Sequence, residues 1–212
     1  MSHGPLAHHF EDLKQQRESA TLGMWLFLLT EIMFFGGLFT AYLVYRFKYP
    51  EAFIQGSHHL DISLGGINTV ILIGSSLTMA LAVHTAHGGK KALQVLFLLL
   101  TVILGAGFLG IKSMEYAHKF HEHLVPGPHF NAHGGPREVQ IFFSLYFAMT
   151  GMHALHMVIG MVIILILALR ASQGKYNQVY FTPIEMTGLY WHFVDIVWIF
   201  LFPLLYLIGR HV

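Results

Sequence analysis

Apolar residues gather in this chain into five long runs that polar segments separate. Leu, Ile, Phe and Met dominate the runs, which cover residues 22–46, 64–86, 91–116, 138–170 and 184–209. A helix of about 20 apolar residues crosses the hydrocarbon core of a bilayer, because the core is roughly 30 Å thick. The apolar and polar positions do not alternate with a period of two, as they do in a barrel strand. The pattern therefore predicts an all-α, polytopic membrane protein, a bundle of five transmembrane helices.

The segment before the first run, residues 1–21, is polar. It lacks a charged stretch followed by an apolar core and a cleavage site, so it does not read as a cleaved signal peptide. Its charged residues suggest a short amphipathic or frayed helix that leads into the first span. We therefore expect a polar segment of residues 1–21, followed by one five-helix transmembrane domain of residues 22–212.

Composition narrows the possible functions. Charged residues make up 11% of the chain and hydrophobic residues 55%, whereas a soluble domain carries about 25% charged residues. The net charge is +1 and Lys and Arg are scattered, so nothing indicates a nucleic-acid partner. The chain has no cysteine, which excludes disulfides, iron–sulfur clusters and thiolate metal sites within it. The 12 Lys and Arg residues divide evenly between the two sides, so the positive-inside rule does not choose an orientation.

Five acids and histidines lie well inside the predicted spans, away from the span ends. A carboxylate at membrane depth costs about 2.5–3.5 kcal/mol on insertion scales, so each acid needs a partner or a proton. We expect the first and fifth spans to place their acids at similar depth near mid-membrane, and the two histidines of the fourth span to share one face. The sequence thus predicts a buried polar cluster of Glu31, His153, His156, His192 and Asp195.

The residues by themselves allow three roles for this cluster. The acids and histidines could hold helices together as hydrogen-bonded pairs, they could relay protons, or the histidines could ligate haem. Haem is the least favoured, because ligation by two histidines needs imidazoles on facing helices and His153 and His156 share one helix. The third run is expected to extend through Lys112 and Glu115 as a helix end in the headgroup region.

A histidine-rich segment follows the third run. Imidazoles spaced at i, i+3 and i+5 can converge on a metal, yet Pro126 and Pro128 interrupt the segment. We interpret it as a polar loop that binds no metal of its own. Its histidines are His118, His121, His123, His129 and His133.

Five motifs follow one another in the five spans. They are Gly23-Met-Trp-Leu-Phe-Leu-Leu-Thr-Glu31, Leu64-Gly-Gly-Ile-Asn68-Thr69, Glu115-Tyr116, Gly151-Met-His153-Ala-Leu-His156 and Trp191-His192-Phe193-Val194-Asp195. Together they resemble subunit III of the haem–copper respiratory oxidases, the cytochrome c oxidase subunit 3 family. The resemblance covers residues of about 20–209. Many members have seven spans and begin with a two-helix hairpin; this chain is similar to the five-span bacterial forms.

The resemblance implies a non-catalytic subunit of a terminal oxidase that reduces O₂ to water and translocates protons. Such a subunit carries no cofactor; haem and copper belong to partner subunits. It packs laterally on subunit I, in a complex with subunit II and other oxidase subunits, binds phospholipid and supports proton uptake. The family places it in the bacterial inner membrane, with the N-terminus cytoplasmic and the C-terminus periplasmic.

The resemblance also suggests two residue roles. Arg170, at the end of the fourth span, is expected to bind a lipid headgroup, and Glu31 is expected to hydrogen-bond His153. Alternative functions are a quinol oxidase subunit III, an accessory subunit of a nitric oxide reductase system, and a stand-alone membrane cytochrome or transporter. The electron donor, cytochrome c or quinol, is set in the partner subunits.

Overall fold

The computed structural model describes residues 6–7, 9–128, 130–131, 136–176 and 178–207. The helices are α1 (Leu13–Lys48), α2 (Pro50–His58), α3 (Ile62–His87), α4 (Lys91–His121), α5 (Val139–Ser172) and α6 (Thr182–Phe202), which continues into a π-helical turn, Pro203–Leu207. No strand occurs in the described residues. Within them, five helices, all except α2, are long and apolar enough to cross a membrane. The predicted all-α, five-span membrane fold is therefore confirmed.

Aspartate side chains fix where two of the helices begin. Asp12 caps α1 by accepting a hydrogen bond from the backbone amide of Gln15 at 2.7 Å. Asp61 caps α3 in the same way through the amide of Ser63 at 2.8 Å. Both carboxylates satisfy amide groups that the first helical turn leaves without partners. As a result α1 begins at Leu13, inside the segment that was predicted to be polar.

The short helix α2 lies between the first two predicted runs, where no helix was expected. It starts at Pro50, and proline is favoured at the first position of a helix because its fixed φ suits the helix and it lacks the amide that would go unbonded. Phe53 of α2 is buried, with its ring 5.1 Å from Tyr42 of α1 and 5.5 Å from Phe142 of α5. This helix therefore joins α1 to α5 at one end of the bundle.

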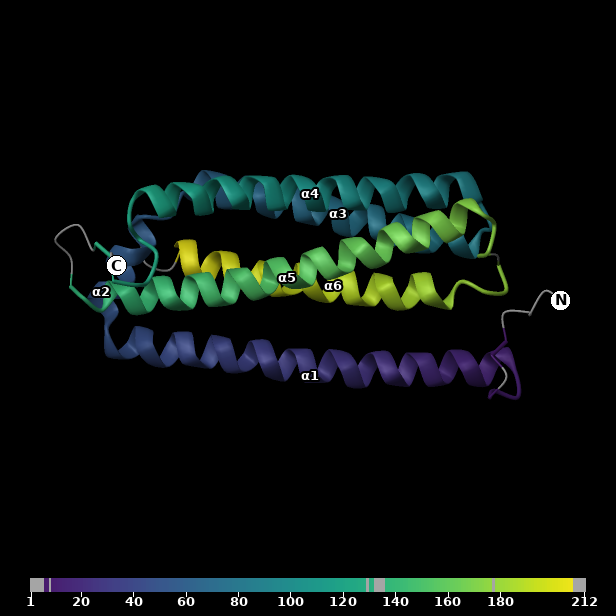
Figure 1. Cartoon of the computed structure of the whole chain (residues 1–212). Helices are drawn as coiled ribbons and strands as arrows, with labels where there is room; N and C mark the ends of the chain where they lie inside the picture. The colour runs from purple at the N-terminus through teal and green to yellow at the C-terminus, as the bar shows by residue number, and fades with distance from the viewer. Residues whose placement is uncertain (1–5, 8, 129, 132–135, 177, 208–212) are drawn as a thin grey trace.

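The helices form a bundle in which α6 is central. In Figure 1, α3 and α4 run as a pair along one side, α5 and α6 occupy the middle, and α1 lies along the other side. Helix α6 contacts α1, α3 and α5. Half of the residues in the most apolar stretch of α6 are buried, against 11% of those in the corresponding stretch of α1. Helix α1 is thus the most peripheral of the spanning helices.

A buried tryptophan shows how tightly the central helices pack. Trp191 of α6 is fully buried between glycines of two other helices. A Cβ atom added to Gly105 of α4 would lie 3.0 Å from the Trp191 ring, and one added to Gly160 of α5 would lie 2.9 Å from it. The indole Nε1 donates a hydrogen bond to Ser75 Oγ of α3 at 3.1 Å. The two glycines are therefore required for the close approach of α4, α5 and α6.

Candidate functional site

Glu31 of α1 and His156 of α5 form a pair inside the bundle. His156 Nε2 lies 3.0 Å from Glu31 Oε2, and the side chains are 11% and 18% exposed. His156 Nδ1 lies 2.8 Å from the carbonyl oxygen of Met152. Because that carbonyl can only accept, Nδ1 carries a proton. The Glu31–His156 contact therefore shares one proton, as carboxylic acid and imidazole or as carboxylate and imidazolium.

The expected partner of Glu31, His153, does not form this contact. Residues three apart on a helix differ by about 60° around its axis, and that rotation separates the two imidazoles. His153 is fully buried where α5 faces α4 and α6, 5.5 Å from the Phe108 ring and 5.3 Å from the Trp198 ring. Neither of its ring nitrogens has a hydrogen-bond partner in the described part of the chain.

The two remaining members of the predicted cluster lie between α6 and α3. His192 Nδ1 is 2.7 Å from Ser76 Oγ, and Asp195 is 4% exposed. Both line a cavity of about 490 Å³ between the two helices. No hydrogen bond joins these residues to Glu31 among the described contacts. The five residues thus occupy three separate places and do not form one cluster.

The interior also holds an ion pair that the sequence reasoning missed. Lys112 Nζ lies 3.0 Å from Glu115 Oε2, one turn further along α4, and both side chains are 3% exposed. Tyr146 of α5 and Tyr206 of the π-helical turn donate hydrogen bonds to Glu115 Oε1 at 2.7 and 2.6 Å. Lys112 donates to the same two hydroxyls, at 3.1 and 2.5 Å. We call these four residues the Lys112 network.

The Lys112 network satisfies its charges internally. An ammonium group has three donors, and Lys112 uses them on Glu115, Tyr146 and Tyr206. The ammonium also lies 4.9 Å from the centre of the Tyr146 ring and 5.1 Å from that of Trp198. Aromatic faces stabilise a cation at such distances. The network therefore ties α4 to α5 and to the end of α6.

Lys112 and Glu115 were expected to lie at a helix end in the headgroup region, and the structure shows that both side chains are enclosed by the bundle. The i,i+3 spacing of opposite charges was visible in the sequence, and so was Glu115-Tyr116 among the motifs. The tyrosines that complete the network come from segments distant in sequence, so the spacing alone could not show that the pair is enclosed.

A second set of charges links three helices at the opposite end of the bundle. Arg17 Nη2 of α1 and His87 Nε2 of α3 lie 3.0 and 3.2 Å from Glu185 Oε1 of α6. The Arg17 guanidinium also lies 5.1 Å from the centre of the Phe181 ring. These side chains are more exposed than the Lys112 network, so solvent weakens their attraction.

Arg170 is exposed at the end of α5. It lies near Tyr176 in the segment that leads to α6. Burial raises the pKa of the Tyr176 hydroxyl, and the positive charge of Arg170 partly offsets that increase. The guanidinium is thus placed outside the apolar part of the helix, where it can reach an anionic group.

The histidine-rich segment is only partly described. His118, His121 and His123 are exposed, and His118 Nε2 lies 3.1 Å from Glu122 Oε1. His129 and His133 lie outside the described residues. Among those that are described, no group of three or more His, Cys, Asp or Glu side chains could hold a metal ion.

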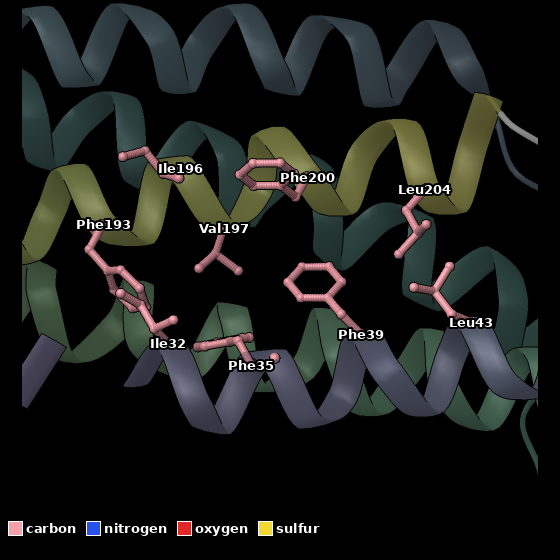
Figure 2. A pocket seen from close by; sticks show the side chains of 10 residues that line it. Ile32, Phe35, Phe39, Leu43, Phe193, Ile196, Val197, Phe200 and Leu204 are labelled. Carbon is pink, nitrogen blue, oxygen red and sulfur yellow. The ribbon is translucent and has the colours of Figure 1, made fainter. Parts of the chain in front are cut away.

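An apolar cavity of about 420 Å³ lies between α1 and α6. Figure 2 shows Phe39 and Leu43 of α1 and Val197 and Leu204 of α6 pointing into the space between the two helices. The cavity is lined by Ile32, Phe35, Gly36, Phe39, Leu43, Phe193, Ile196, Val197, Phe200 and Leu204.

Comparison with known proteins gives a consistent result. Residues 7–210 match the protein family described as cytochrome c oxidase subunit III. A cytochrome c oxidase subunit 3 of Synechocystis is 36% identical over 88% of this chain and 74% of its own length. One from Corynebacterium diphtheriae is 35% identical over 89% and 87%. The quinol oxidase subunit 3 of Bacillus subtilis is 30% identical over 99% and 98%.

Proposed function

This chain belongs to the cytochrome c oxidase subunit III family, and from this we propose that it acts as the non-catalytic third subunit of a haem–copper terminal oxidase. It is a multi-pass membrane protein with five spanning helices. The match to the family over residues 7–210 is the observation that carries the proposal. The oxidase reduces O₂ to water and translocates protons, and this subunit supports it without exchanging electrons itself.

The side chains that could ligate a metal support placing haem and copper in partner subunits. A haem held by two histidines needs two imidazoles that face each other with free nitrogens. His156 is engaged by Glu31 and by the Met152 carbonyl, and His153 is enclosed by aromatic rings from α4 and α6. The absence of cysteine in the sequence removes the thiolates of a two-copper centre. Among the described residues, His153 and His156 thus do not fit as a facing pair of haem ligands.

The subunit's work is therefore structural. The Lys112 network and the Glu31–His156 pair connect helices inside the bundle, which makes a stiff body able to pack laterally on the haem-bearing subunit I and on other oxidase subunits. Through this packing it supports proton uptake by the complex. Phospholipid binds at its apolar surfaces and at Arg170. The protein resides in the bacterial inner membrane with its N-terminus cytoplasmic, and five spans place the other end on the periplasmic side.

A quinol oxidase subunit is the second candidate. The Bacillus subtilis relative with that name aligns with 99% of this chain, which is more of the chain than the Synechocystis cytochrome c oxidase subunit covers. The electron donor is a property of the partner subunits, so both candidates assign the same role to this chain.

Purification of the complex through a tag on this chain tests the proposal. We expect haem- and copper-bearing subunits to co-purify, identified by mass spectrometry, and the preparation to consume oxygen with reduced cytochrome c or with quinol. The isolated chain should show no haem band in a reduced-minus-oxidised spectrum. A haem band in the isolated chain, or turnover of nitric oxide in place of oxygen, would overturn the proposal.

A further inference from the structure

Two cavities on the outside of the bundle follow one another along α6. The cavity of about 490 Å³ between α3 and α6 reaches Ile199. A second cavity of about 410 Å³ lies between α1, α3 and the start of α6, where Arg17 and Glu185 line it. Ala80 and His192 line both cavities. The two cavities therefore form one groove, which we call the α3–α6 groove, with a charged end and an apolar end.

Arg17 gives the groove a cationic end at the depth of lipid headgroups. It lies five positions before Leu22, where the first apolar run begins, and that is about 7.5 Å at 1.5 Å per residue. The headgroup region is about 5–7.5 Å thick on each side of the hydrocarbon core. The Arg17 side chain is 50% exposed, and its Nη2 donates a hydrogen bond to Glu185 Oε1 at 3.0 Å. A guanidinium has five donors, so Arg17 keeps donors that can bind a phosphate.

The other end of the groove presents an apolar surface to the membrane. Ile73 and Leu77 of α3 and Ile199 of α6 line it and are 55%, 61% and 48% exposed. Both carboxylate oxygens of Asp195 are buried below this surface, so the acid does not interrupt it. At the junction of the two cavities Ala80 contributes only a methyl group, which leaves the groove continuous.

The length of the groove matches one leaflet of a bilayer. Ile199 lies 14 positions after Glu185, about 21 Å along α6 at 1.5 Å per residue. Half of a bilayer, headgroups included, is about 20–22 Å thick. A molecule that fills the groove thus needs an anionic group at the membrane surface and an apolar part that ends near mid-membrane, which is the shape of a phospholipid.

We propose that the α3–α6 groove is a binding site for one phospholipid, with its phosphate on Arg17 and an acyl chain along α3 and α6 as far as Ile199. The inference deepens the proposed function, which assigns phospholipid to apolar surfaces and to Arg170. It names a second site, formed by α1, α3 and α6, whereas Arg170 ends α5. Ala80 is the narrow point of this site, because it lines both cavities.

Photolabelling in membranes that contain the intact complex tests the path of the lipid. The probe is phosphatidylglycerol with a diazirine at the end of one acyl chain, and mass spectrometry locates its adducts. We expect adducts at Ile199 or Ile73, at the apolar end of the groove. Adducts at Ile103 of α4, which is 64% exposed and lines neither cavity, report lipid that merely surrounds the bundle and serve as the internal reference.

Two variants close the site in different ways. Arg17→Gln removes the cation, and we expect it to lower labelling of Ile199, relative to Ile103, about tenfold, as for the loss of a charge-assisted hydrogen bond. Ala80→Phe fills the junction of the two cavities and should lower the same ratio at least as much. Ala80 is exposed, so the new ring does not have to enter the core.

Each variant has a matched control. Arg17→Lys keeps a cation at the mouth of the groove and should label as wild type does. Ala106→Phe places the same ring on an exposed position of α4 that lines neither cavity, and it should also label as wild type does. Helix content measured by circular dichroism shows that each variant folds. An unchanged labelling ratio in both Arg17→Gln and Ala80→Phe, or no adduct in the groove of wild type, would overturn the proposal.

The outcomes separate this inference from the proposed function. If the wild-type chain co-purifies with haem-bearing subunits but neither variant changes the labelling ratio, the lipid site is wrong and the oxidase assignment stands. If wild type does not co-purify with such subunits, the proposed function fails. The labelling ratio of the chain in its membrane then still decides whether the groove holds a phospholipid.

Discussion

Lys112 and Glu115 form an ion pair with an Nζ–Oε2 distance of 3.0 Å inside the bundle, where each side chain is 3% exposed. Two tyrosine hydroxyls complete the pair, each accepting from the ammonium and donating to the carboxylate. In an apolar interior each charge of such a pair compensates the other, so removing one charge leaves the other buried without compensation.

Lys112→Met should strongly destabilise the chain. Methionine keeps most of the side-chain length but leaves the Glu115 carboxylate without its counter-charge. Breaking a buried pair in this way costs about 3–5 kcal/mol. Unfolding in mixed detergent, followed by circular dichroism, measures the loss. Lys14→Met is the control, because Lys14 has a side-chain exposure of 83% and should change stability by less than about 0.5 kcal/mol.

The double variant Lys112→Met with Glu115→Gln distinguishes charge from packing. Glutamine removes the uncompensated charge while its amide oxygen still accepts from Tyr146 and Tyr206. We expect the double variant to recover most of the stability that Lys112→Met loses. A double variant no more stable than the single one would show that the ammonium acts through packing alone.

Glu31→Gln should have a small effect. The amide can donate to His156 Nε2 while His156 Nδ1 continues to donate to the Met152 carbonyl, so the contact between α1 and α5 persists. We expect a loss of about 0.5–1.5 kcal/mol, the value of one hydrogen bond. Oxygen consumption and proton ejection, measured together in vesicles, check the role of the ionisable group. Complete loss of proton ejection in an assembled complex would show that Glu31 relays protons.

Arg170→Ala should release anionic phospholipid. The exposed guanidinium at the end of α5 can pair with a phosphate, whereas alanine cannot. Lipids extracted from the purified complex are quantified by mass spectrometry, and we expect less anionic phospholipid per complex than in wild type. Lys175→Ala, an exposed cation in the following segment, is the matched control and should retain it. Equal lipid content in the two variants would contradict a specific role for Arg170.

Gly160→Ala should destabilise the bundle, because the new methyl group would lie 2.9 Å from the Trp191 ring. Overpacking of this kind costs about 1–3 kcal/mol. Gly107→Ala on α4 is the control: no atom lies within 4 Å of a Cβ there, and alanine favours a helix over glycine by up to about 1 kcal/mol. Thermal unfolding of both variants should therefore show changes of opposite sign.

Stability at the end of α4 should depend on pH through Glu122. Burial raises the pKa of this carboxyl, but the hydrogen bond and charge of Lys119, with smaller contributions from His118 and His59, lower it below its usual value overall. A carboxyl with a lowered pKa in the folded state stabilises the fold above the pKa of the unfolded chain. That stabilisation is lost as the pH falls through the folded pKa. Wild type should thus unfold at a higher temperature than Glu122→Gln at pH 7.

The difference between wild type and Glu122→Gln should narrow as the pH is lowered below the normal range of a glutamate. Melting temperatures of the two proteins, measured across this range in one detergent, check it. A difference that grows on acidification would mean that Lys119 does not stabilise the charged form of Glu122.

The sequence by itself determined the number and character of the spanning helices. Long apolar runs have only one way to satisfy their backbone in lipid, which is to form helices, so five runs predict five spans without any knowledge of packing. Ordered motifs such as Trp191-His192-Phe193-Val194-Asp195 also carried the family resemblance, because they are local and can be read in order. The polar helix expected before the first span is continuous with it in α1, and Asp12 caps its start.

Only the tertiary structure decided which polar groups meet. Depth along a helix can be counted from the sequence, and it placed Glu31 near the level of the α5 histidines. The choice between His153 and His156 depends on the rotation of α5 about its axis, which packing against α1, α4 and α6 sets. The same is true of Lys112 and Glu115, whose spacing is visible in the sequence. Their burial depends on Tyr146 and Tyr206, which other parts of the chain bring to them.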